Sequence, residues 1–253
     1  RGDVVVIQRG PYSETLAVNK AGLTLMGAVS FGYPDHVIVS GVTSITASGC
    51  SFYNMEFFSN SAVSASVIDG LFSAGVNGTW FENCSFSGTT AVEPEAGVVI
   101  WGGNNHTFRN CIIINHTHGI VLRANINDYV SHVTVRDCEF LEQTTADITT
   151  AAIAATASVA AYGHTDLGSG VGAGVRNFRC EGNFFGAGEV VPARFINIAG
   201  SSSGTMTDNR FGSATHAIGT IVIPTGIFYS DNAAEEGRTG VYSGAIGTSG
   251  RPD

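Results

Sequence analysis

The chain has 253 residues, of which 43% are hydrophobic and only 13% are charged, and its formal net charge is −9. This apolar content can offset the ordering entropy of folding, which excludes a disordered chain. No basic stripe suggests a nucleic-acid partner, and no apolar run reaches the roughly 18 residues of a membrane-spanning helix. Gly, Thr, Ser, Asn and Val are abundant, which favours strands and tight turns over helices.

A six-residue pattern recurs along the chain at nearly constant spacing. It reads FENCSF at 81–86, FRNCII at 108–113 and VRDCEF at 135–140. Its central pair of residues aligns in seven places, at intervals of 29, 27, 27, 45, 26 and 23 residues. The seven pairs are Asn54-Met55, Asn83-Cys84, Asn110-Cys111, Asp137-Cys138, Gly182-Asn183, Asp208-Asn209 and Asp231-Asn232. A nearly fixed period of this length is typical of solenoid folds.

The residues around each pair predict a strand, a corner and a second strand. Before the pair, an alternation such as Val133 and Val135 places every second side chain on one inward face. Asn, Asp and Gly tolerate left-handed backbone angles and therefore suit a tight corner. After the corner an inward apolar residue follows in six repeats, at Phe57, Phe86, Ile113, Phe140, Phe185 and Phe211.

The pattern predicts an all-β fold, a right-handed parallel β-helix of about seven coils. Equivalent residues would stack about 4.8 Å apart and form ladders of Cys, Asn and Phe. We expect the β-helix over residues 1–236 and a C-terminal cap or extension over 237–253, since open ends expose strand edges. The 45-residue interval exceeds one coil, so an Ala-, Thr- and Gly-rich loop excursion or an enlarged coil is expected at about 144–174.

The N-terminal stretch GDVVVIQRGPYSETLAVNKAGLTLMG (2–27) resembles the first coil of pectate-lyase-like β-helix proteins. The resemblance lies in the Gly-Asp, the Val run, the Gly-x-Tyr-x-Glu and the Leu-Thr-Leu-x-Gly elements. With the later repeats it covers most of residues 2–232. The scaffold of this superfamily carries lyases, hydrolases, adhesins and viral spikes, so the resemblance indicates the fold rather than the activity.

Two enzyme templates from this superfamily find no match in the chain. Polygalacturonase-like hydrolases carry Asn-x-Asp, Asp-Asp, Gly-His-Gly and Arg-Ile-Lys elements, and the last three are missing here. Pectate-lyase-like enzymes use calcium-binding acids with Lys and Arg, but the one lysine, Lys20, lies in the first coil. The sequence therefore predicts no catalytic, cofactor-binding or metal-binding residues and no cofactor.

Several carboxylates could in principle face a groove in pairs, as glycosidases require. Each is interpreted as a solvated corner or a turn cap, and Asp137 in particular occupies the corner position of its repeat. These residues are Glu93, Glu95, Asp128 (beside Tyr129), Asp137, Glu139 and Glu142.

The histidines, cysteines and outward charges carry further expectations. His106 shares the slot of Val133 and should point into or near the core. His116 and His118 have metal-like spacing but are expected as a surface or turn pair.

One outward slot on three coils holds charged residues, namely Glu82, Arg109 and Arg136, so a Glu–Arg stack is expected there. The cysteines are expected to be free, buried core residues; they are Cys50, Cys84, Cys111, Cys138 and Cys180.

The functional hypothesis is a non-enzymatic structural protein on the surface of a phage particle. It would be a capsid decoration protein, a head fibre or a tail spike that binds glycans or a host surface. The expected partners are two further copies in a homotrimer, other virion proteins such as the major capsid protein, and polysaccharide, with no nucleic acid and no membrane. The alternatives are a polysaccharide lyase or glycoside hydrolase on this scaffold, and a bacterial surface adhesin.

Overall fold

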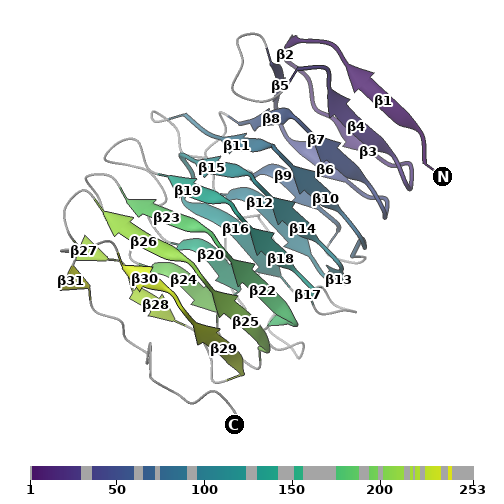
Figure 1. Ribbon diagram of the computed structural model, residues 1–253. Coiled ribbons are helices and arrows are strands. Elements are labelled where there is room, and N and C mark those ends of the chain that lie inside the picture. Colours follow the sequence, from purple (N-terminus) through teal and green to yellow (C-terminus); the bar gives the residue numbers. More distant parts are fainter. Residues whose placement is uncertain are drawn as a thin grey trace.

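Parallel strands of successive coils pair in constant register in the computed structural model, which confirms the predicted fold class (Figure 1). The structure describes residues 2–29, 36–59, 65–71, 75–89, 96–123, 130–141, 151–155, 175–187, 194–198, 202–213, 217–218, 220–222, 226–234 and 239–240. Every regular element within these ranges is a β-strand, and no described segment forms a helix that could cross a membrane.

Three long sheets, here sheets A, B and C, form the sides of the coils, with one strand per coil in each. Sheet A contains β1 (Val4–Ile7), β4 (Thr24–Gly27), β7 (Ser51–Tyr53), β10 (Trp80–Glu82), β14 (Thr107–Arg109), β18 (Thr134–Arg136), β22 (Phe178–Glu181), β25 (Gly204–Thr207) and β29 (Ile227–Ser230). Sheet B contains β2 (Gly10–Tyr12), β5 (Val37–Ser40), β8 (Met55–Phe58), β11 (Ser85–Ser87), β15 (Ile112–Ile114), β19 (Glu139–Leu141), β23 (Phe184–Ala187), β26 (Arg210–Ser213) and β30 (Ala233–Ala234).

Sheet C and two short sheets complete the coils. Sheet C contains β3 (Ala17–Val18), β6 (Thr43–Ile45), β9 (Ala65–Asp69), β12 (Ala96–Trp101), β16 (His118–Arg123), β20 (Ala151–Ala155), β24 (Arg194–Ile198) and β28 (Thr220–Val222). The short sheets pair β13 (Gly103–Asn104), β17 (Val130–Ser131) and β21 (Val175–Arg176), and β27 (Ala217–Ile218) with β31 (Thr239–Gly240).

The corner between sheets A and B is made by the residue that precedes each inward Cys, Met or Asn. All seven predicted corner residues adopt a left-handed backbone, with φ between 50° and 66°. Asn and Asp occupy six of these positions because they tolerate this conformation better than other residues that carry a Cβ. The seven residues are Asn54, Asn83, Asn110, Asp137, Gly182, Asp208 and Asp231.

Stacked aromatic rings fill the interior, as predicted. Phe81 lies between Phe52 and Phe108, with ring centroids 4.9 Å and 5.2 Å away and interplanar angles of 14°. Phe185 stacks in the same way between Phe140 and Phe211, at 4.8 Å and 4.9 Å. Offset stacking of this kind adds to the hydrophobic free energy of burial. The periodic Phe residues therefore hold one coil over the next.

The five cysteines are free and buried, as expected. Cys84, Cys111 and Cys138 occupy one slot in three neighbouring coils, since the strands that follow them pair in register. Burial raises the pKa of Cys84 to about 12 and raises the pKa of Cys138 well above its ordinary value. At neutral pH the thiols of Cys84 and Cys138 are therefore protonated, and they act as small apolar side chains in the core.

In the C-terminal coils the slot of the cysteines holds a ladder of asparagines, of which Asn183 and Asn209 are buried and Asn232 is half-buried. Asn183 Oδ1 accepts a hydrogen bond of 2.9 Å from the Cys138 N–H, and Asn209 Oδ1 accepts one of 3.0 Å from the Asn183 N–H. Asn232 Oδ1 does the same for Asn209 at 3.0 Å. Each side-chain amide also donates to a backbone carbonyl of the preceding coil, as Asn209 Nδ2 does to Cys180 at 3.0 Å. The ladder thereby satisfies backbone groups that the corner leaves unpaired.

Sheets A and B hold nine strands each, against about seven coils expected from the repeat. The difference arises at the N-terminal end, where β1 and β4 precede the first recognisable corner pair at Asn54. Within the expected excursion, β20 pairs with β16 and β24, so residues 151–155 belong to sheet C. The rest of 144–174 lies outside the described residues, as does nearly all of the expected cap at 237–253.

We predict that Asn209→Ala lowers the free energy of unfolding by about 3 kcal/mol, because it leaves the buried Asn183 N–H without its acceptor and removes the hydrogen bond from Asn209 Nδ2 to the Cys180 carbonyl. Urea unfolding followed by circular dichroism measures this loss. Thr207→Ala, a half-buried outward position at the end of β25 and two residues before Asn209, serves as the control and should change stability by less than about 0.5 kcal/mol. Equal effects of the two substitutions would show that the ladder adds nothing beyond ordinary packing.

Candidate functional site

Inside the coils, His106 is fully buried, as predicted from its repeat slot. Its Nδ1 lies 2.9 Å from Oδ2 of Asp69, and Oδ1 of Asp69 accepts a hydrogen bond of 3.1 Å from the Thr79 hydroxyl. All three side chains are sealed from solvent. Asp69 and His106 belong to different coils, so this cluster links the coils. Removal of either side chain would leave buried polar atoms of the other without their partner.

His116 and His118 are both buried, so the surface position allowed by the expected surface or turn pair is wrong. His116 lies at the corner after β15, with Nε2 3.1 Å from Oγ of Ser66. Burial lowers the pKa of His116 to about 3, so its ring is neutral at pH 7. Among the described residues, no group of three or more His, Cys, Asp and Glu side chains is placed to hold a metal ion.

The carboxylates considered from the sequence do not converge on a groove in the described part of the chain. Asp137 is exposed at its corner, with Oδ2 3.2 Å from Nε of Arg136, and Glu139 is exposed on the outer face of sheet B. The remaining residues of that group, Glu93, Glu95, Asp128, Tyr129 and Glu142, lie outside the described residues. The interpretation of Asp137 as a corner residue is confirmed by its φ of 53°.

The outer face of sheet A carries two parallel rows of side chains that cross the strands. The first, here the outer row, consists of Trp80, Thr107, Thr134, Arg179, Thr205 and Phe228. The second, here the charged row, consists of Tyr53, Glu82, Arg109, Arg136, Glu181 and Thr207. The predicted Glu–Arg stack is part of the charged row, where Arg109 Nη1 lies 3.4 Å from Glu82 Oε1.

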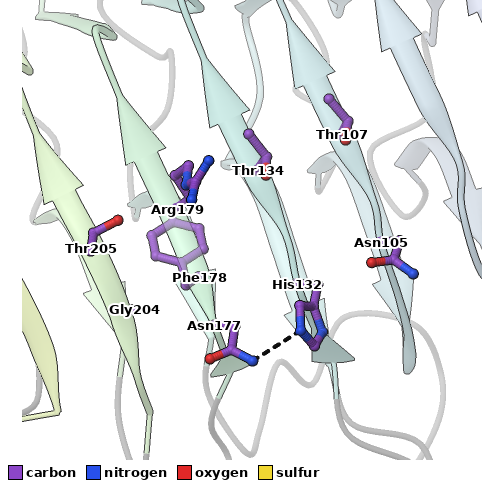
Figure 2. Close-up of a pocket in the computed structure, with 9 residues that line it drawn as sticks. All are labelled: Asn105, Thr107, His132, Thr134, Asn177, Phe178, Arg179, Gly204 and Thr205. Carbon is purple, nitrogen blue, oxygen red and sulfur yellow. Dashed lines mark hydrogen bonds between the residues drawn. The ribbon is translucent and has the colours of Figure 1, made fainter.

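A hollow of about 500 Å³ lies where the outer row meets the preceding corner of the coils (Figure 2). Thr134, Arg179 and Thr205 contribute side chains from three neighbouring strands of sheet A. From the corner, Asn177 Nδ2 lies 3.0 Å from Nε2 of His132, within hydrogen-bonding distance. The complete lining is Asn105, Thr107, His132, Thr134, Asn177, Phe178, Arg179, Gly204 and Thr205.

The corner that borders the hollow depends on left-handed residues and on Gly204. His132 and Asn177 have φ of 52° and 53°, and Asn105 has 62°. Gly204 has φ of 152°, and a Cβ placed there would lie 1.9 Å from the carbonyl oxygen of Phe178. Only glycine allows this close approach of two coils, and it therefore sets the shape of one wall of the hollow.

The lining offers hydroxyl, amide, imidazole and guanidinium groups on a rigid sheet. Such groups form directional hydrogen bonds to hydroxyl-rich or acidic ligands. The aromatic side chains of Trp80 and Phe228 lie at the two ends of the outer row, where Phe228 is 42% exposed. These described residues therefore form an extended polar surface with apolar ends.

Comparison with known proteins agrees with this architecture. A family model described as a right-handed β-helix region matches residues 34–158. The chain is a right-handed parallel β-helix. No curated protein matches the sequence of this β-helix.

Solved structures with a similar course of the chain include two forms of a pectin methylesterase from Aspergillus niger. The penultimately deglycosylated form has 14% identity and a TM-score of 0.51, covering 96% of this β-helix and 82% of that chain. The deglycosylated form has 12% identity and a TM-score of 0.54, covering 97% and 82%. ORF18 of Geobacillus virus E2 has 12% identity and a TM-score of 0.48, covering 92% of this β-helix and 53% of that chain. At these identities the pectin methylesterase likeness describes the fold alone.

Sequence reasoning found the charged row but missed the outer row. Its members in the middle coils stand four residues before the inward Cys or Asn of each repeat, as Thr134 does before Cys138 and Arg179 before Asn183. The same alignment that placed Glu82, Arg109 and Arg136 together would have found them. The 45-residue interval separated Thr134 from Arg179 in sequence and concealed that the two are neighbours in the β-helix.

We predict that acid destabilises the β-helix through His116. The unfolded chain binds a proton on this ring below its ordinary pKa of 6.5, whereas the folded chain does so only near pH 3. Stability should therefore fall as the pH drops from about 6.5 towards 3, by up to about 1.4 kcal/mol per pH unit. Denaturant midpoints measured across this range should be less pH-dependent in His116→Gln. The exposed control His132→Asn, which matches its corner neighbours, should keep the dependence.

We predict that Gly204→Ala distorts the wall of the hollow, since its Cβ would overlap the Phe178 carbonyl and the backbone angle is unfavourable for alanine. A loss of about 2 kcal/mol or more in unfolding free energy is expected. Gly186→Ala tests the specificity of this effect on sheet B, where the nearest atoms are ring and methyl carbons of side chains that can move. A Gly204→Ala protein as stable as the wild type would refute the close-approach explanation.

Proposed function

We propose that the chain is a structural protein of a phage particle surface that binds glycans through the hollow on sheet A. The observation that carries the glycan-binding part is the outer row, in which Thr134 and Thr205 flank Arg179. Sugars present hydroxyl groups at regular spacing, and the row offers side chains at the strand spacing of about 4.8 Å. Aromatic side chains at its ends can pack against the apolar faces of sugar rings.

The particle-surface part of the proposal is supported by composition and architecture. The chain is long enough for nine stacked strands in sheet A, yet contains a single lysine among its 12 basic residues. Rigid elements that hold binding groups at fixed distances suit attachment to a polymer on a cell surface. We propose that three copies lie side by side in a homotrimer and contact other virion proteins such as the major capsid protein.

The second candidate is a polysaccharide lyase or glycoside hydrolase. Its support is the charged row, where Glu82 and Glu181 share the outer face of sheet A with Arg109 and Arg136. Carboxylates can act as general acids or bases, and guanidinium groups can hold a charged substrate, in both lyases and hydrolases. Release of reducing ends or of unsaturated products from an array of polysaccharides would favour this candidate, and loss of that release in Glu82→Gln or Glu181→Gln would assign it to this face.

We predict that the double substitution Thr134→Ala and Thr205→Ala weakens binding to bacterial surface polysaccharides by tenfold or more. Two hydrogen bonds at about 1 kcal/mol each account for this loss. Affinities are measured by biolayer interferometry on immobilised polysaccharides. Thr24→Ala is the matched control, because Thr24 lies in line with the outer row on β4, three coils before Thr107. Equal affinities of the double variant and the control would contradict glycan binding at the hollow.

The particle assignment has its own test. Mass spectrometry of purified phage particles from the source should detect the chain, at hundreds of copies for a decoration protein or a few trimers for a spike. Light scattering of the isolated protein should give the mass of a trimer. A monomer that cleaves polysaccharide would contradict the proposal and favour the enzyme.

A further inference from the structure

The charges around the hollow are unevenly satisfied. In the charged row, Arg109 pairs with Glu82 at 3.4 Å and Arg136 pairs with Asp137 at 3.2 Å. Arg179 is exposed in the outer row, and in the described part of the chain it has no acidic partner. The guanidinium of Arg179 is therefore the cation on this face whose charge is left for a ligand.

The neighbours of Arg179 along the outer row are uncharged. Thr134 and Thr205 stand one strand to either side, at about 4.8 Å per strand. Further out lie Thr107 and the aromatic side chains of Trp80 and Phe228. Figure 2 shows Arg179 between the two threonines, with Asn177 at the corner below. A ligand chain that lies along the row thus meets one cation and several neutral hydrogen-bonding groups.

The surroundings disfavour a ligand with a negative charge on every unit. Glu181 lies on the same strand as Arg179, and the net charge of the whole chain is −9. A carboxylate opposite Thr134 or Thr205 would lose part of its hydration without meeting a cation, which is unfavourable. A single carboxylate opposite Arg179 instead gains a charge-assisted, bidentate hydrogen-bonding partner.

We propose that the hollow on sheet A binds a polysaccharide in which acidic sugars are separated by neutral ones, with Arg179 holding the carboxylate. This inference rests on the proposed glycan-binding function and adds the class of glycan. The polymer runs across the strands, along the axis of the coils, so that neutral sugars face Thr134 and Thr205. A polyuronate, which is charged on every sugar, is a poor ligand for the same site.

The test uses an array of immobilised polysaccharides. It holds gellan and xanthan, in which uronates are separated by neutral sugars, each also in carboxyl-reduced form, together with polygalacturonate and dextran. The wild-type protein should bind the sparsely charged polymers about tenfold or more tightly than their reduced forms. Arg179→Gln should abolish that preference. The control Arg210→Gln, which removes an exposed arginine from the outer face of sheet B, should leave it intact.

The outcomes separate the two proposals. Equal binding of native and carboxyl-reduced polymers, a preference retained in Arg179→Gln, or tighter binding of polygalacturonate would overturn the inference while leaving glycan binding in place. Absence of binding to every polymer would overturn the proposed function and the inference with it. Thermal unfolding of each variant checks that the fold is intact before affinities are compared.

Discussion

The structure depends on hydrogen bonds between the backbones of successive coils in constant register. Each coil can pair in this way only if it returns to the same path, and the left-handed corner between sheets A and B enforces that return. Once the path is fixed, like side chains lie over one another, both inside and outside. The Phe stacks, the Asn ladder and the outer row are three results of the same constraint. The site is therefore a property of the repeat rather than an addition to it.

The interior slot after each corner is filled by two kinds of side chain along the chain, thiols in the middle coils and amides in the C-terminal coils. At the slot after the corner, the middle coils place protonated thiols, which fill space and make only weak hydrogen bonds. From Asn183 onward the same slot holds amides that bond both to the next amide and to the backbone. A buried amide is favourable only when its donors and acceptors are met, and the stacking of equivalent coils meets them. Regular stacking thus allows polar groups in a core that is otherwise apolar.

Much of this could be predicted from the sequence, because the determinants are local. Corner residues such as Asn110 and Asp137 indicate a left-handed turn. The alternation of apolar and polar residues before them indicates which side chains point inward. The burial of His106 followed from its alignment with Val133. The two coils before Asn54 were not counted, because their corners lack the pair of Asn, Asp or Gly followed by Cys, Met or Asn that marks the other seven. The burial of His116 also could not be predicted, since it depends on contacts such as that with Ser66, fifty positions away in sequence. Prediction of the hollow would have required the knowledge that Thr134 and Arg179 lie on neighbouring strands. The interval of 45 residues between them conceals this in the sequence.

The outer row has one member on each of the six sheet A strands from β10 to β29, so its length is set by the number of coils it crosses. Duplication of a single coil would extend the row by one position and leave the existing positions unchanged, since each coil contacts only its neighbours. Loss of a coil would shorten it by the same step. The length of polysaccharide that the proposed surface contacts can thus be altered by copying or deleting one segment of the gene. The proposed binding surface of this β-helix would therefore lengthen or shorten by one coil at a time.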